Sequence, residues 1–195
     1  MSLIMAIKFS EGYLLSGDSR LSYKNDPTKH SDNTYKIFCY DKRIGVAFHH
    51  CADIDGNPIE NVLEDFLSSA DQTLTVYGLA KKLKEHIKNL KSDLDTKFHI
   101  LGYEKEECLM YEFHLQQSED IIQNHGLYVT GEQTDFAFNQ LKESYQENKA
   151  LDEAVNYIKK IYEKTEQVFD SVGGEIDILM LSPKGEALWI QQKKK

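Results

Sequence analysis

The stretch Gly12-Tyr13-Leu14-Leu15-Ser16-Gly17-Asp18-Ser19-Arg20 decides how this 195-residue chain is interpreted. An apolar run from Leu3 to Phe9 precedes it, and the turn-like Ser10-Glu11-Gly12 separates the two runs. Apolar runs on either side of a short turn are typical of a β-hairpin. The chain is therefore predicted to open with a hairpin whose second strand ends at the polar Asp18-Ser19-Arg20.

A second hairpin is predicted from Tyr35 to Tyr40 and from Arg43 to Phe48, joined by the turn Asp41-Lys42. The segment from Leu21 to Asn33 lies between the two hairpins. It is polar and carries Asn25-Asp26-Pro27. Such residues favour turns, so this segment is predicted to be an exposed loop.

The apolar spacing then changes to steps of three and four residues over 59–67 and 76–94, which predicts two amphipathic helices. Pro58 marks the start of the first, and Thr75 or Thr73 can cap the second. Strands are expected again over 97–103, 108–115 and 127–130. Two more helices over 136–145 and 151–168 and a closing hairpin over 176–181 and 187–190 complete the pattern.

Helices that arrive in pairs between blocks of antiparallel strands exclude strict β-α-β alternation. They are most simply stacked as outer layers over two central sheets. The predicted fold class is therefore α+β, a four-layer αββα sandwich of two antiparallel sheets flanked by helix pairs. With neither a linker nor a repeat, residues 1–195 are expected to form a single domain.

Composition excludes several classes of function. The formal charge of −9 disfavours binding to nucleic acid, and no apolar run reaches the ~20 residues that a membrane span requires. The three cysteines have no C-x-x-C spacing, which argues against a zinc ribbon and fits a reducing cytoplasm. His49, His50, Cys51 and Asp53 are possible metal ligands. Because neighbouring strand residues point to opposite faces, however, neither a metal nor another cofactor is expected.

Four pieces of the chain together resemble the proteasome β-type subunits and their bacterial relatives, which are N-terminal nucleophile hydrolases. They are the opening Ile7-Lys8-Phe9 with Gly12–Arg20, the strand Tyr35-Lys36-Ile37-Phe38, the strand Arg43-Ile44-Gly45-Val46-Ala47, and Gly173-Gly174-Glu175-Ile176-Asp177-Ile178. The pieces come in the family's order and span nearly the whole chain. The order of elements is also that of the family's four-layer fold.

The resemblance implies a nucleophile at the start of the mature chain. Ser2 stands sixteen residues before Asp18, and it would carry a free α-amine once Met1 is removed. An α-amine has a pKa of about 7.7 to 8, so it can act as the base for its own side chain. Asp18 would then orient the terminus and Lys36, whose ammonium favours the anionic hydroxyl. Met-Ser-Leu could instead be a leader left by an expression vector.

The same resemblance implies an oxyanion donor and a substrate pocket. The segment from Phe48 to Asp53 follows the fourth strand, and His50 stands at or near the position of the family's glycine, whose backbone N–H faces the oxyanion. Leu21, Phe38 and Phe48 stand where the family lines its first specificity pocket, which predicts bulky apolar side chains next to the scissile bond.

Two departures favour an alternative, a catalytically inactive relative that acts as a structural or binding module. Glu132 and Val172 occupy the positions of the family's supporting serines, with Ser171 close by. If the chain is active, the implied substrate is a peptide or protein. The implied assembly is a homo-oligomer, a ring among the options, working with an ATP-dependent unfoldase in the cytoplasm.

Overall fold

The computed structural model describes residues 2–23, 26–50, 53–91, 94–116, 120–131 and 133–193. In this part of the chain an α+β fold is built from two five-stranded antiparallel sheets and four helices, which confirms the predicted class. The first sheet has the strand order β12-β1-β2-β13-β14, and the second has the order β11-β10-β9-β6-β5.

The strands of the first sheet are β1 (Leu3–Phe9), β2 (Gly12–Asp18), β12 (Tyr128–Gly131), β13 (Ile176–Leu181) and β14 (Ala187–Gln191). Those of the second are β5 (Ile37–Tyr40), β6 (Ile44–His50), β9 (Thr96–Glu104), β10 (Glu107–His114) and β11 (Ile122–Asn124). The helices are α1 (Ile59–Ser69), α2 (Val76–Leu90), α3 (Thr134–Ser144) and α4 (Leu151–Val168). The predicted hairpins β1–β2 and β5–β6 are both present.

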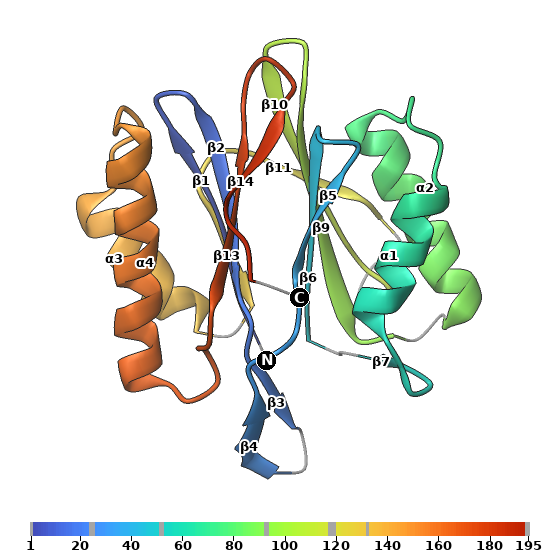
Figure 1. Cartoon of the computed structure of the whole chain (residues 1–195), viewed down its shortest axis with the longest axis horizontal. Helices are drawn as coiled ribbons and strands as arrows, with labels where there is room; N and C mark the ends of the chain where they lie inside the picture. Colours follow the sequence, from blue (N-terminus) through green and yellow to red (C-terminus); the bar gives the residue numbers. More distant parts are fainter. Residues whose placement is uncertain are drawn as a thin grey trace.

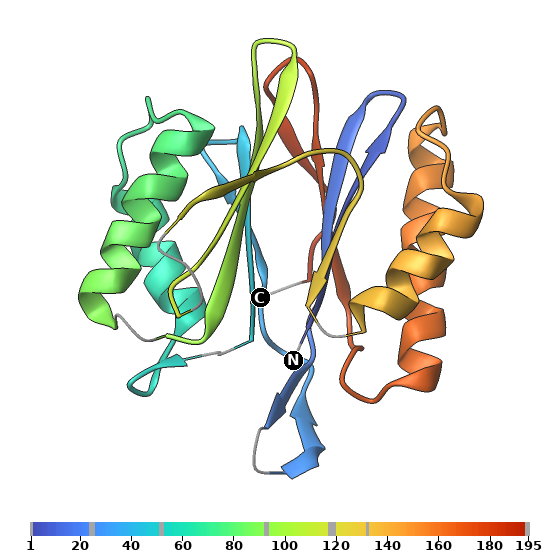
Figure 2. The ribbon, with the colours of Figure 1, turned by 180° about the vertical axis from the view of Figure 1, so that it is seen from behind.

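Each sheet has helices along one of its faces. In Figure 1, α3 and α4 lie beside the first sheet and α1 and α2 beside the second, and the reverse view in Figure 2 agrees. Strand β1 explains the arrangement, because its run of apolar residues buries side chains on both faces. Leu3, Met5 and Ile7 belong to the core beneath α3 and α4, whereas Ile4 and Ala6 belong to the core between the sheets.

The prediction of an exposed loop from Leu21 to Asn33 is wrong, because β3 (Leu21–Tyr23) and β4 (Asp26–Ser31) pair as a two-stranded ribbon. The ribbon projects from the lower end of the molecule in Figures 1 and 2. Its base is held by the Arg20 guanidinium, which contacts both carboxylate oxygens of Asp32 at 2.8 and 2.9 Å. Turn propensity depends on neighbouring residues only, so it cannot predict a pairing between side chains that are twelve residues apart.

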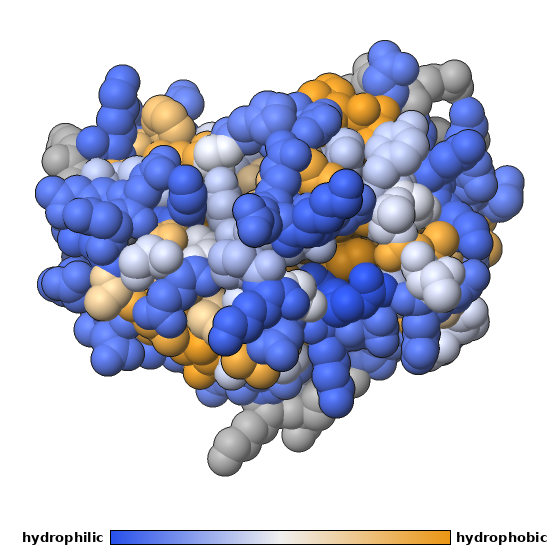
Figure 3. Space-filling view, turned by 90° about the horizontal axis from the view of Figure 1, so that it is seen from above, coloured by the Kyte–Doolittle hydropathy of each residue, from blue (hydrophilic) through white to orange (hydrophobic). Residues whose placement is uncertain are grey.

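A small hairpin of β7 (Asp53–Ile54) and β8 (Asn57–Pro58) precedes α1 and was not predicted, nor was the short edge strand β11. None of the described helices combines the length and the apolar character needed to cross a membrane. Figure 3 shows a face on which hydrophilic side chains predominate, with apolar surface confined to smaller patches. This surface agrees with the acidic, highly charged composition.

Candidate active site

The carboxylate of Asp18 is the centre around which the candidate site is built. It lies at the end of β2 and is 1% exposed. Its Oδ1 accepts hydrogen bonds from the backbone N–H of Leu3 at 2.8 Å and from the ammonium of Lys36 at 3.1 Å. Its Oδ2 accepts from the backbone N–H groups of Gly173 at 3.2 Å and Arg20 at 3.3 Å. Three segments distant in sequence, those of Leu3, Lys36 and Gly173, therefore meet at one side chain.

Lys36 is buried with Asp18, since its residue is 1% exposed. Its ammonium also donates to the carbonyl oxygen of Arg20. Burial lowers the pKa of Lys36 below its ordinary value, and the attraction of Asp18 opposes that effect. A lysine with a lowered pKa exchanges its proton more readily, which is a property common among catalytic lysines.

Ser2 directly precedes β1 and is 4% exposed. The next residue, Leu3, pairs with Gly131 of β12 and donates its N–H to Asp18, so Ser2 stands one residue from the Asp18–Lys36 pair. The backbone of Gly131 has a φ of +106°, and a Cβ there would lie 1.9 Å from the carbonyl oxygen of Ser2. Only glycine allows this close approach. The expected removal of Met1 concerns a residue outside the described part of the chain.

The guanidinium of Arg20 contacts residues other than Asp18. It binds Asp32, contacts Glu166 at 3.2 Å and donates to the carbonyl of Val172 at 3.2 Å. Through these contacts Arg20 fixes the segment before Gly173, whose N–H then reaches Asp18.

His50 ends β6 with a φ of +88°, a conformation that side chains rarely adopt and that glycine adopts easily. The expectation that His49 and His50 point to opposite faces is wrong, because this φ breaks the strand geometry and leaves their rings 4.3 Å apart.

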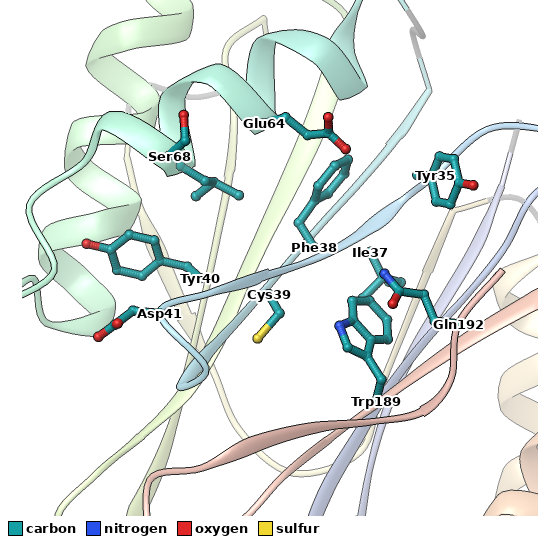
Figure 4. A pocket seen from close by; sticks show the side chains of 11 residues that line it. Tyr35, Ile37, Phe38, Cys39, Tyr40, Asp41, Glu64, Ser68, Trp189 and Gln192 are labelled. Atoms are coloured by element: carbon teal, nitrogen blue, oxygen red, sulfur yellow. The ribbon is translucent and has the colours of Figure 1, made fainter. Parts of the chain in front are cut away.

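The three residues predicted to bind substrate are not gathered in one cavity. The rings of Phe38 and Phe48 stack with their centroids 6.3 Å apart, in the core beneath α1 and α2. Leu21 lies on the ribbon strand β3. Phe38 alone of the three lines a described cavity. That cavity, of about 330 Å³, opens between the edge strands β5 and β14, where Figure 4 shows Trp189 and Cys39 directed into the same space.

A second cavity, of about 360 Å³, adjoins the start of β1 and was not predicted. Lys97 and Glu112 line it from neighbouring strands, together with Thr130, Gly131 and residues of the histidine-rich end of β6. Glu112, a charged residue between Tyr111 and Phe113, was the available signal. It could not be used, because the cavity also takes residues of β12, which belongs to the other sheet.

The positions of the supporting serines give a mixed result. Val172 is completely buried in the core beneath α3 and α4, while Glu132 lies outside the described residues. Ser19 is buried, and its hydroxyl has no hydrogen-bond partner among the described residues. Within the same part of the chain, no three His, Cys, Asp or Glu side chains are grouped so that they could hold a metal ion, and Cys51 is not described.

No protein-family model and no curated protein matches this chain. Among solved structures, it is similar to a Gly-1 mutant of Anbu from Hyphomicrobium sp. strain MC1, with a TM-score of 0.74 and 14% identity over 96% of this chain and 85% of that one. It is also similar to Anbu from the same strain, with a TM-score of 0.71 and 14% identity over 99% and 89%.

These matches contradict the family inferred from the sequence. The two solved structures named above are of Anbu, and no family model supports the earlier assignment. The pieces of sequence that suggested this family, such as Gly12–Arg20, form strands and turns that belong to the shared fold. At 14% identity, the likeness establishes the fold that this chain has in common with Anbu.

Proposed function

We propose that this chain is an amide or peptide hydrolase whose nucleophile is the hydroxyl of Ser2, acting once Ser2 begins the polypeptide. One observation carries the proposal. The N–H of Leu3 and the ammonium of Lys36 bind the same oxygen of the buried Asp18, at 2.8 and 3.1 Å. This arrangement holds the residue after the nucleophile and a buried cation at one point, which is the preorganisation that nucleophilic catalysis requires.

The free α-amine of Ser2 serves as the base. With a pKa of about 7.7 to 8, a useful fraction is unprotonated near neutral pH. The amine takes the hydroxyl proton while Oγ attacks the amide carbonyl carbon. The Oγ–C bond forms, the C–N bond breaks, and the leaving amine receives that proton. Water, deprotonated by the same α-amine, then hydrolyses the ester and restores the hydroxyl.

Lys36 and His50 act on the charges of this reaction. The Lys36 ammonium favours the anionic form of the neighbouring hydroxyl and disfavours protonation of the α-amine. The backbone N–H near His50 is the proposed oxyanion donor. The φ of His50, +88°, supports this role. A non-glycine residue keeps such a strained backbone conformation where the surrounding structure requires it.

The architecture of the proposed enzyme is a four-layer αββα sandwich formed by one domain over residues 1–195. The separate cores beneath α1 and α2, between the sheets, and beneath α3 and α4 support this arrangement. We further propose that the protein is a cytoplasmic homo-oligomer that acts on a peptide or protein. The proposed assembly is a ring, and the proposed partner is an ATP-dependent unfoldase.

One observation favours a non-catalytic structural or binding module instead. Val172 is fully buried at the position where a supporting serine was expected, so its side chain offers no hydroxyl to the site. In that alternative, the Asp18–Lys36 pair stabilises the fold and has no role in chemistry.

The decisive experiment measures the intact mass and the N-terminal sequence of untagged protein after treatment with a peptide epoxyketone, which reacts with a hydroxyl beside a free α-amine. We expect one adduct on Ser2 and none on Ser2→Ala. Lys36→Met should slow the adduct's formation about 100-fold. Lys8→Gln is the matched control, because Lys8 is an exposed lysine paired with Glu147.

Circular dichroism establishes that each variant is folded before its labelling is compared. A retained Met1, or a folded protein that forms no adduct, would refute the hydrolase and leave the non-catalytic module. Equal labelling of Lys36→Met and the unmodified protein would remove Lys36 from the mechanism while leaving Ser2 as the nucleophile.

A further inference from the structure

Gly131 links the cavity of about 360 Å³ beside β12 to the residue of the proposed nucleophile. Gly131 lines the cavity, and it also packs so closely on Ser2 that a Cβ would lie 1.9 Å from the Ser2 carbonyl oxygen. His50 of β6, whose backbone is the proposed oxyanion donor, also lines the cavity. A substrate held at Ser2 would therefore extend a neighbouring group into this space.

The acceptor groups of the cavity are already used. Glu112, which is 8% exposed, is the one acidic residue among its described lining residues. Its Oε1 accepts from the Lys97 ammonium at 3.2 Å, and its Oε2 accepts from the hydroxyl of Tyr128. The Nδ1 atom of His99 lies 3.7 Å from the same Oε2. A cationic group entering the cavity would find this carboxylate occupied and would be repelled by Lys97.

The donor groups of the cavity are used less. An ammonium has three N–H donors, and the described contact of Lys97 with Glu112 accounts for one of them. The side chain of Lys97 is 25% exposed, so the remaining donors are accessible from the cavity. His114 lines the same space, but its Nε2 already lies 3.2 Å from Oδ1 of Asp95. Lys97 is therefore the cationic donor that the cavity offers to an acidic group, in a chain whose formal charge is −9.

We propose that this cavity is the subsite for a carboxylate-bearing side chain of the substrate, that is, an aspartate or glutamate adjoining the scissile amide. This inference rests on the proposed function, because it places the subsite beside the Ser2 nucleophile. Lys97 supplies a charge-assisted hydrogen bond to the substrate carboxylate, and Glu112 holds Lys97 in place. The Lys97–Glu112 pair therefore determines which substrates are accepted and takes no part in bond cleavage.

The test compares the binding of two peptides by isothermal titration calorimetry, with the Ser2→Ala protein so that no turnover interferes. The probes are acetyl-Ala-Ala-Glu-amide and its isostere acetyl-Ala-Ala-Gln-amide. We expect the glutamate peptide to bind about tenfold more tightly, and this preference should weaken as salt is added. Equal affinities, or no binding of either peptide, would overturn the proposal.

A double variant, Lys97→Gln with Glu112→Gln, removes both charges together and so leaves no unpaired buried charge. We expect it to bind the two peptides equally, whereas Lys160→Gln on the exposed surface of α4 should keep the preference. A preference that survives in the double variant would also overturn the proposal. The epoxyketone experiment judges Ser2 separately, so adducts without a glutamate preference reject the subsite alone, and a preference without adducts rejects the hydrolase alone.

Discussion

Asp18 determines where the first residues of the chain lie, because its two oxygens accept hydrogen bonds from three separate segments and from the nearby Arg20. A buried carboxylate is tolerated only when its charge is compensated, and Lys36 supplies that compensation at 3.1 Å. Removing either partner alone would leave an uncompensated buried charge. The pair is therefore a structural requirement of this fold, whatever its role in chemistry.

Two buried histidines predict how stability depends on pH. Burial lowers the pKa of His49 and of His99 well below the ordinary value of 6.5, so both are neutral in the folded protein. The unfolded chain takes up protons at these residues as the pH falls below about 6.5, and the folded chain does not. The free energy of unfolding should therefore decrease on acidification, by up to about 1.4 kcal/mol per pH unit for each histidine.

Urea unfolding at about pH 7 and about pH 5.5 measures this dependence. His99→Phe preserves a ring that can stack on His49 and Tyr128, so it should remove the contribution of one histidine. Phe98→Leu in the same strand changes a buried residue without changing a titratable group, so it is the control and should leave the pH dependence unchanged. If His99→Phe has the same pH dependence as the unmodified protein, the proposed origin in burial is wrong.

At the scale of elements, the start of α2 provides a direct test. The Thr75 hydroxyl accepts a hydrogen bond from the N–H of Gly78 at 3.0 Å, whereas the Thr73 hydroxyl donates to the exposed Asp71. Thr75→Ala should lower the free energy of unfolding by about 1 kcal/mol, and Thr73→Ala by less than about 0.5 kcal/mol. Equal losses in urea titrations would show that the cap does not act through this hydrogen bond.

The elements that could be predicted from the sequence are those whose signal is local. Apolar residues recur in α2 at steps of three and four residues, and two strand-like runs flank the turn Asp41-Lys42. Both patterns depend only on neighbouring residues. The ribbon β3–β4 could not be predicted, because the Arg20–Asp32 pairing that holds it lies outside any local pattern.

The candidate site shows the same division. The resemblance brought Ser2, Asp18 and Lys36 forward together, and the structure brings Asp18 and Lys36 to 3.1 Å of one another. The cavity that holds Lys97 and Glu112 could not be found, because its walls come from both sheets. Sequence spacing carries no information on which strands of different sheets face each other.

At the scale of the whole molecule, apolar side chains remain exposed on the outer helices. Tyr77 and Leu90 of α2 are 49% and 48% exposed, and Val168 at the end of α4 is 59% exposed. We expect these faces to be covered in a homo-oligomer. Light scattering after gel filtration should therefore give a particle mass that is a multiple of the 22.5 kDa chain.

The double variant Tyr77→Glu with Leu90→Glu should shift that mass toward 22.5 kDa, because it places charges in the buried interface. Leu188→Glu is the control, since Leu188 is equally exposed but lies on β14 rather than on an outer helix. A 22.5 kDa particle for the unmodified protein would contradict the expected assembly.

The hydrogen bonds from Gly173 to Asp18 and from Arg20 to the carbonyl of Gly173 join the beginning of the chain to a segment near its end. During synthesis on the ribosome, the first hairpin emerges long before this later segment has been translated. The carboxylate cannot acquire its full set of partners until then. A nascent copy shorter than this lacks the complete arrangement, so the hydrolytic activity proposed for Ser2 would arise only after Gly173 has been translated.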